Sequence, residues 1–280
     1  MNDSNITWNT KNLFSGTAGY YARFRPGYPN EVFTLLREKY SLDRFSRILD
    51  LGCGTGQIAL PISNYAGEII AIDPQEDMLV EGRQIALANG IKNIQWVLGE
   101  SGNLPQMAGS VGKINLTVIA RAFHWMDKEQ VLQDLYALTK PGGGVAIIWD
   151  SELRAGVKLP WKEVIDRVIW QWLGNNRKAG INGTFTHPLK GFDVFLKESD
   201  FQEVETEIIQ LERIWTIDQI IGYLYSTSYC SPPILGSNKE SFENDLRTCL
   251  GKLDSSEHFI DQVSVEIITA FKKPSELIDI

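Results

Sequence analysis

The 280-residue sequence contains only three cysteines and three histidines, and it lacks long apolar or basic runs. The cysteines, Cys53, Cys230 and Cys249, form no CxxC pair. This argues against a disulfide framework and a zinc site, and it is typical of a reducing cytosol. The longest apolar stretches, residues 114–120 and 145–149, are far too short to cross a bilayer. The first eleven residues are polar and have no signal-peptide core, so we expect a cytoplasmic protein that does not enter a membrane.

Positive charge is also scarce. The chain has 27 Lys and Arg against 35 Asp and Glu, which gives a net charge of -8. No long Lys/Arg cluster interrupts this acidic balance, so a nucleic-acid backbone would meet no electrostatic attraction and is not expected as a partner. The content of 43% hydrophobic and 22% charged residues is ordinary for a globular protein. A chain of this length can bury enough surface to fold without disulfide bonds or bound metal ions.

Short β-branched runs alternate with helical segments in the first half of the chain. We expect strands at Arg47–Leu51, Glu68–Asp73, Ile94–Gly99, Ile114–Ala120 and Gly144–Asp150. Their mostly continuous apolar character is typical of parallel strands that are covered on both faces. We expect helices at residues 57–65, 76–89 and 128–139, the last ended by Lys140–Pro141–Gly142–Gly143. This alternation predicts the α/β class, with a doubly wound, mostly parallel, Rossmann-like sheet.

A helix is also expected at residues 31–40, ahead of the first strand. After residue 150 the pattern changes: helices are expected at residues 161–173, 217–225 and 242–253, and longer strands at 204–215 and 263–271. We therefore expect one domain over residues 1–280, with a seven-stranded core. That core would span about residues 30–154 plus strands near 201–215 and 258–273, and a helical cap would span about 155–190 and 217–253.

A glycine-rich loop, Leu49 to Gly56, ends the first expected strand and enters a helix. Glycines let the backbone turn sharply and let a ligand approach closely. A dinucleotide fingerprint would place Gly or Ala at position 57, but that residue is Gln57 and the glycines follow a GxGxG spacing instead. Asp50 at the edge of the loop would repel a phosphate and attract an ammonium or sulfonium group. The loop is therefore a poor pyrophosphate site.

The second expected strand ends at Asp73, 17 residues past Gly56. A carboxylate at this place can accept both hydroxyls of a ribose, and it disfavours a 2′-phosphate. The alternative is that Asp73 is a helix N-cap before Pro74. The glycine loop upstream favours ribose binding.

The loop and Asp73 together resemble motif I and the following acidic position of class I S-adenosylmethionine-dependent methyltransferases. The resemblance covers residues 14–149 and is strongest to the methyltransferase type 11 branch that includes trans-aconitate methyltransferases. It implies that the glycine backbone holds the methionine part of S-adenosyl-L-methionine, that Asp50 orients its amino group and that Asp73 binds its ribose. The cofactor-binding residues implied in this stretch are Asp50, Gly52, Gly54, Thr55, Gly56 and Asp73.

The segment Gly99–Pro105 resembles the family's GDAxxLP segment, whose acidic residue receives the adenine amino group. Glu100 stands at that position here, followed by Ser101, and both are expected at the cofactor. A solvated acidic turn is the alternative. Pro74 and Met78 are expected to cover the adenine ring, although a Met at helical spacing is more often a core residue.

After the fourth expected strand, Ala120–Trp125 resembles the family's "HW" segment. The resemblance implies that the Ala120 carbonyl lies near the methionine end and that His124 and Trp125 face the transferring methyl. His124 is then a candidate general base, since an unperturbed histidine pKa lies near neutrality, or it only fills space. Trp125 is expected to form a wall of the acceptor pocket.

Near the start, Tyr21–Pro29 resembles the family's YxxxRPxYP segment. The resemblance implies that Tyr21 and Arg25 close over the cofactor, with Arg25 at its carboxylate, for which a fork of donors is well suited. Alternatively, Arg25 is a surface residue before a proline turn. Among the aromatic residues of the expected cap, Tyr229 is our candidate for lining the acceptor site.

The sequence thus predicts an S-adenosylmethionine-dependent methyltransferase that acts on a small molecule. A carboxylic acid acceptor needs no base but favours a nearby cation, for which Arg121 and Arg154 are candidates. We expect a small-molecule methyl acceptor as the partner, no metal, and a monomer or homodimer. Two alternatives remain: a non-catalytic S-adenosylmethionine-binding protein, and an NAD(P)-dependent oxidoreductase, which Gln57 disfavours.

Overall fold

The computed structural model describes residues 14–152, 159–174, 178–179, 183–184, 190–256 and 258–274. The chain divides into two compact units. The first, called the sheet unit here, comprises Gly27–Ser151, Pro188–Ile209 and Ser264–Ile280. The second, called the helical unit, comprises Met1–Pro26, Glu152–His187 and Gln210–Val263. The expectation of a single domain with a helical cap stays a prediction.

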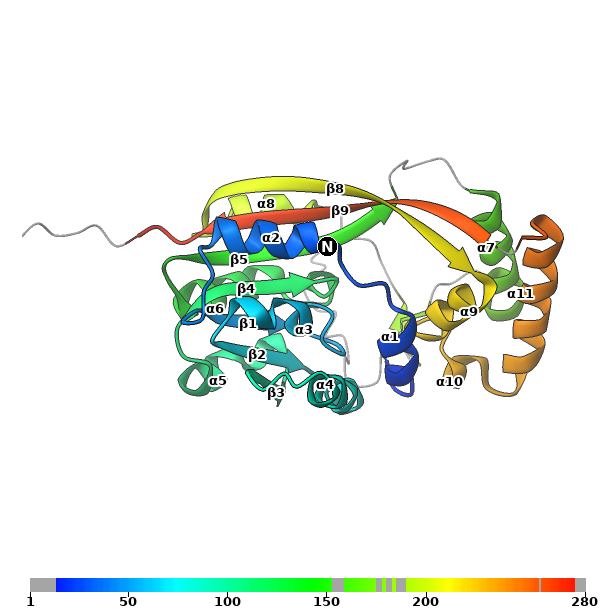
Figure 1. The fold of residues 1–280 in the computed structure, drawn as a ribbon, viewed down its shortest axis with the longest axis horizontal. Coiled ribbons are helices and arrows are strands. Elements are labelled where there is room, and N and C mark those ends of the chain that lie inside the picture. The colour runs from blue at the N-terminus through cyan, green and yellow to red at the C-terminus, as the bar shows by residue number, and fades with distance from the viewer. Residues whose placement is uncertain are drawn as a thin grey trace, which may run out of the picture. The chain divides into compact units, whose positions relative to one another are not determined.

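The strands form one seven-stranded sheet of order β3-β2-β1-β4-β5-β9-β8 (Figure 1). The strands are β1 (Arg47–Leu51), β2 (Glu68–Asp73), β3 (Ile94–Leu98), β4 (Ile114–Ala120), β5 (Thr139–Glu152), β8 (Gln202–Thr216) and β9 (His258–Phe271). The first five pair in parallel, β3 with β2, β2 with β1, β1 with β4 and β4 with β5. The predicted doubly wound, mostly parallel, Rossmann-like sheet is confirmed.

Helices precede the first strand and connect the later ones. They are α2 (Asn30–Lys39), α3 (Ala59–Ile62), η2 (Ser63–Tyr65), α4 (Glu76–Ala88), η3 (Ser101–Asn103), α5 (Leu104–Val111), η4 (Phe123–Trp125), α6 (Lys128–Leu138) and α8 (Phe192–Lys197). Helix α6 begins where the sequence provides a cap, because the Asp127 carboxylate accepts the backbone N–H of Gln130 at 3.2 Å.

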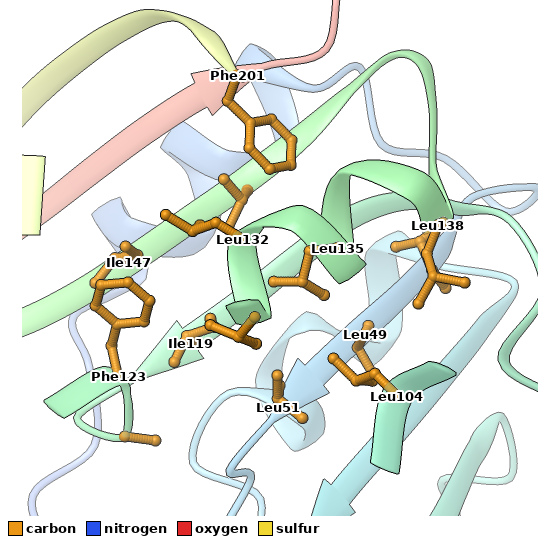
Figure 2. Packing of buried hydrophobic residues seen from close by; sticks show 14 of the residues in the cluster. Leu49, Leu51, Leu104, Ile119, Phe123, Leu132, Leu135, Leu138, Ile147 and Phe201 are labelled. Atoms are coloured by element: carbon orange, nitrogen blue, oxygen red, sulfur yellow. The ribbon is translucent and has the colours of Figure 1, made fainter. Parts of the chain in front are cut away.

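A hydrophobic core joins one face of the sheet to α5, α6 and α8. Figure 2 shows Leu49 and Leu51 of β1 in the same cluster as Leu104 of α5 and Leu132 and Leu135 of α6. Each of these leucines is at least 99% buried, and burying a leucine contributes roughly 1.5–3 kcal/mol. Because alternate residues of a strand point to opposite faces, Asp50 lies on the face away from this core.

The strand boundaries correct one expectation. Lys140–Pro141–Gly142–Gly143 does not separate α6 from a strand that starts at Gly144, because β5 already begins at Thr139. The glycines pair with the end of β9: the Gly142 N–H donates to the Lys272 carbonyl at 2.8 Å, and the Lys272 N–H donates to the Gly143 carbonyl at 2.8 Å. A neighbouring strand therefore gives these residues the hydrogen bonds that a loop would lack.

The helical unit is built from helices that pack on one another. They are α1 (Ala18–Phe24), α7 (Pro160–Leu173), α9 (Ile217–Tyr225), α10 (Pro232–Leu235), η5 (Gly236–Asn238) and α11 (Lys239–Leu253), with a short antiparallel pair, β6 (Lys178–Ala179) and β7 (Gly183–Thr184). Trp161, Leu224 and Phe242 belong to their shared core. None of the helices in the described ranges is both long and apolar enough to cross a membrane.

Candidate functional site

The loops that follow β1, β2, β3 and β4 meet at one edge of the sheet. The parallel register pairs Leu51 with Ile72 and Asp73 with Leu98, so β1, β2 and β3 end at the same level. Asp50 is also paired with Val118, close to the end of β4. In open α/β sheets this carboxyl edge is where ligands bind. The residues singled out in the sequence analysis between Asp50 and Trp125 lie in or next to these loops.

The glycine loop has a backbone that other residues would strain. Gly52, Gly54 and Gly56 have φ values of +77°, +55° and +93°. A Cβ on Gly52 would lie 2.4 Å from the Ala122 Cβ, and one on Gly56 would lie 2.7 Å from the Trp96 ring. The GxGxG spacing therefore reflects both a left-handed backbone and close packing.

Backbone hydrogen bonds attach the loop to the end of β2. The Ile72 carbonyl accepts the N–H groups of Gly52 and Cys53 at 2.8 and 3.0 Å. Within the loop, the Gln57 amide donates to the buried Thr55 hydroxyl at 2.7 Å. Gln57, which ruled out the dinucleotide spacing, thus has a structural role here.

Asp73 ties the loop to β2. Its Oδ2 accepts the Gly54 N–H at 2.8 Å, and its Oδ1 accepts the Gln75 N–H at 2.9 Å. The N-cap of α4 is Gln75, so the alternative that Asp73 caps this helix is wrong. Each carboxylate oxygen has two acceptor positions, so both oxygens keep one for further donors such as hydroxyl groups.

Asp50 is 99% buried, and its Oδ2 accepts the Ala59 N–H at the start of α3 at 3.0 Å. Burial raises the pKa of Asp50 to about 7, and the charge of Asp73 adds to this rise. Burial also raises the pKa of Asp73 to about 6, although the N–H groups of Gln75 and Gly54 oppose the rise. Two buried acids under the loop would repel a pyrophosphate and stabilise a cationic ligand.

The end of β3 continues this edge. The Gly99 N–H donates to the Asp73 carbonyl at 3.1 Å, which brings the half-buried Glu100 and Ser101 next to Asp73 along the edge. The Glu100 N–H donates to Asn103 Oδ1 at 3.2 Å at the start of η3. Of the two residues expected to cover an adenine ring, Pro74 is half-buried and Met78 is 98% buried within α4.

The end of β4 has a strained residue that the sequence did not reveal. Arg121, directly after Ala120, has a φ of +54°. Such a backbone costs of order 1–3 kcal/mol outside glycine and is common at functional sites. Its guanidinium forms two contacts with Asp150 from β5, Nε to Oδ1 at 3.1 Å and Nη1 to Oδ2 at 3.3 Å. The charge of Arg121 is therefore neutralised within the protein.

An aromatic cluster follows Arg121. The His124 ring centroid lies 4.5 Å from that of Trp125 and 5.0 Å from that of Trp149, the latter in an edge-on arrangement. Trp149 in turn meets Phe192 at 5.6 Å. Sequence reasoning found His124 and Trp125 but missed Trp149 and Phe192. The position of Trp149 near the end of an expected strand could have revealed it, whereas Phe192 carried no such signal.

Tyr21, Arg25 and Tyr229 belong to the helical unit. The Arg25 guanidinium lies 4.8 Å from the ring centroids of both Tyr21 and Tyr223, and its Nη2 donates to the Ser226 carbonyl at 3.2 Å. Arg25 is thus half-buried in a stack of tyrosines rather than a free surface residue. Tyr229 packs against the core of this unit. The predicted contacts of these three residues with a cofactor stay predictions, and Arg154 lies outside the described residues.

Comparisons with known proteins relate this sheet and its glycine loop to methyltransferases. Residues 48–143 match the family described as a methyltransferase domain. An uncharacterised methyltransferase of Schizosaccharomyces pombe is 29% identical over 191 residues, which cover 68% of this chain and 71% of that protein. Among solved structures, the YcgJ protein of Bacillus subtilis has a similar fold, with a TM-score of 0.54, 14% identity and coverage of 88% of this chain and all of that one. The chain therefore contains a class I S-adenosylmethionine-dependent methyltransferase domain.

The protein is a methyltransferase, and S-adenosylmethionine is its cofactor. The residues at the carboxyl edge fit this molecule. It carries an ammonium and a sulfonium but no phosphate, which agrees with the two buried acids, and its ribose offers hydroxyl donors for the remaining acceptor positions of Asp73. Within the described ranges, no group of three or more His, Cys, Asp and Glu side chains could hold a metal ion.

Proposed function

We propose that this S-adenosylmethionine-dependent methyltransferase acts on a small molecule that enters beside His124 and Trp125. The observation that carries the proposal is the placement of the aromatic cluster, which directly follows β4 at the same edge as the glycine loop. When bound, the cofactor supplies an electrophilic methyl group on a positively charged sulfur. The protein then has mainly to align the acceptor and exclude water, and good alignment can be worth about 7–11 kcal/mol of the barrier.

The cofactor assignments made from the sequence belong to this proposal. Asp50 would stabilise the ammonium group and Asp73 would accept the ribose hydroxyls. Gly52, Gly54, Thr55, Gly56 and the Ala120 carbonyl would line the methionine part. Pro74, Met78, Glu100 and Ser101 would surround the adenine, and the family resemblance adds Tyr21 and Arg25 to the cofactor-binding residues.

Two classes of methyl acceptor differ in the residues that they need at the site. The resemblance to the trans-aconitate branch favours a carboxylic acid, which needs a cation and no base. The two contacts from Arg121 to Asp150 argue against Arg121 as that cation. A phenol or a carbon acid instead needs a base, and an imidazole nitrogen of His124 would take its proton. The ion pair of Arg121 favours this second class.

The test is to follow S-adenosylhomocysteine formation over a panel that contains carboxylic acids, phenols and carbon acids. Turnover of a phenol or carbon acid should fall about 10²–10⁴-fold in His124→Gln with unchanged cofactor affinity. His258→Gln is the matched control, since this exposed histidine starts β9. Turnover of a carboxylic acid that is insensitive to His124→Gln would assign the other class. Tight cofactor binding with no turnover across the panel would favour the non-catalytic alternative.

A further inference from the structure

The amino ends of the strands form a second site, at the opposite edge of the sheet from the glycine loop. A hollow of about 560 Å³ there is lined by Arg44, Arg47, Lys113 and Lys140 together with Glu68 and Phe45. Arg47 and Glu68 start β1 and β2, Lys113 precedes β4, and Lys140 is near the start of β5. A five-residue strand such as β1 spans about 17 Å, so one small ligand cannot reach both edges.

Three of the four cations in this hollow form no ion pair with another described residue. Arg47 is neutralised, since its Nε contacts Glu68 Oε2 at 2.8 Å. Lys113 donates to the Ala137 carbonyl and Lys140 to Asn115 Oδ1, each at 2.8 Å, and both acceptors are uncharged. Neither ammonium is paired with a carboxylate, and each keeps two further donors.

The third such cation is Arg44, whose guanidinium lies 4.8 Å from the ring centroid of Phe45. This guanidinium forms no ion pair or hydrogen bond within the described residues, so its five donors are available. The pKa of the neighbouring Asp43 is lowered, mainly by the Phe45 N–H and in smaller part by the charge of Arg44. Phe45 is 74% exposed, so part of its ring is accessible to a ligand. The hollow thus combines a fork of donors, two ammonium groups and an exposed aromatic ring.

This concentration of positive charge occurs in a protein whose net charge is -8. Its field acts on neighbouring groups as well. The pKa of Lys272 is lowered, mainly by burial but also by the charge of Lys113. Cations that remain close together without a carboxylate partner repel one another, and a bound anion would remove that repulsion. The volume lies within the usual range of small-molecule sites.

We propose that this hollow binds a small multivalent anion of the phosphate class, either a free polyphosphate or the phosphate chain of a nucleotide. The Arg44 fork suits phosphate oxygens bidentately, and Lys113 and Lys140 act as point charges. Phe45 offers a surface on which a nucleotide base stacks. The site is independent of methyl transfer, because its residues lie at the other edge of the sheet.

Titration calorimetry with pyrophosphate in low salt tests the proposal. We expect saturable binding that weakens as salt is added, because exposed charges are screened. The Lys113→Gln/Lys140→Gln variant should bind about tenfold more weakly or worse, since each exposed charge contributes up to about fivefold. Lys252→Gln, an exposed lysine of the helical unit, is the matched control and should bind as the unaltered protein does.

Two further variants and a second ligand test which residues bind the anion and which class of anion is bound. Arg44→Glu alters an exposed side chain and should abolish binding while the melting temperature stays unchanged. An affinity for ADP above that for pyrophosphate, lost in Phe45→Ala, would assign nucleotides as the source, whereas equal affinities would assign free polyphosphates. Absence of saturable binding, equal affinity in the double variant, or displacement of pyrophosphate by S-adenosylhomocysteine would overturn the proposal.

Discussion

The two buried acids under the glycine loop should make cofactor binding depend on pH. Asp50 has a pKa of about 7 in the protein without ligand, so it is mostly protonated at pH 5. The ammonium of the cofactor stays protonated below pH 7, since α-amino groups titrate near 8. If that ammonium requires an ionised Asp50, binding releases a proton, and affinity should rise about ninefold from pH 5 to 6 and about fivefold from pH 6 to 7. The total effect is about 50-fold, or about 2.3 kcal/mol.

Calorimetry at pH 5, 6 and 7, in pairs of buffers with different ionisation enthalpies, measures both the affinity and the proton release. We expect close to one proton per cofactor at pH 6. Asp50→Asn is nearly isosteric and its amide oxygen can still accept the Ala59 N–H, so the loop should persist. This variant should bind more weakly and with a flatter pH profile. An affinity in the unaltered protein that is constant from pH 5 to 7 would refute the reasoning.

The same acid predicts a change of stability in the protein without ligand. Because its pKa is raised from 3.8 to about 7, the native state binds more protons than the unfolded state between these values. The contribution of Asp50 to the free energy of unfolding should therefore be most favourable below about pH 4 and fall as the pH rises to about 7. Asp50→Asn should remove this fall and should be up to about 4 kcal/mol more stable at pH 8, measured by urea unfolding. Parallel pH profiles for both proteins would contradict this.

Three substitutions test other parts of the site. Gly56→Ala should cost about 1–2 kcal/mol of stability through its positive φ and should also weaken cofactor binding, because its Cβ would meet Trp96. The control Gly90→Ala, with a φ of +69° but open space around it, should lose stability alone. Equal cofactor affinities of the two variants would contradict this. Asp73→Asn should weaken cofactor binding in calorimetry, because its amide has a single acceptor oxygen where the carboxylate has two, which accept from Gly54 and Gln75. Asp150→Asn frees Arg121, so the KM of carboxylic acid acceptors should fall relative to that of neutral ones; an unchanged ratio would argue against Arg121 at the acceptor.

The fold could be predicted largely from local patterns. Continuous apolar runs defined β1, β2 and β4 to the residue, because these strands are covered on both faces. The start of β5 was missed since Gly142 and Gly143 become part of a strand only through pairing with Lys272, a contact over more than a hundred residues. Short helices such as α5 and α8 were also missed, because one or two turns give little periodicity to detect.

The candidate site could be predicted where its residues lie close together along the chain. The glycine loop and the acid that ends β2 belong to one contiguous strand–helix–strand unit, so Asp50, Gly56 and Asp73 could be recognised together. The contact of Arg121 with Asp150 joins two strands, and that of Trp149 with Phe192 joins β5 to α8. Neither pair leaves a pattern along the chain. The basic hollow was missed for the same reason, since its cations are dispersed over three segments.

A crystal structure of the protein with S-adenosylhomocysteine would test most directly whether the carboxyl edge of the sheet holds the cofactor. We predict electron density along the loop after β1, with both ribose hydroxyls within hydrogen-bonding distance of the Asp73 carboxylate and the amino group on the side of Asp50. Density at any other place, with the loop after β1 empty, would contradict the account.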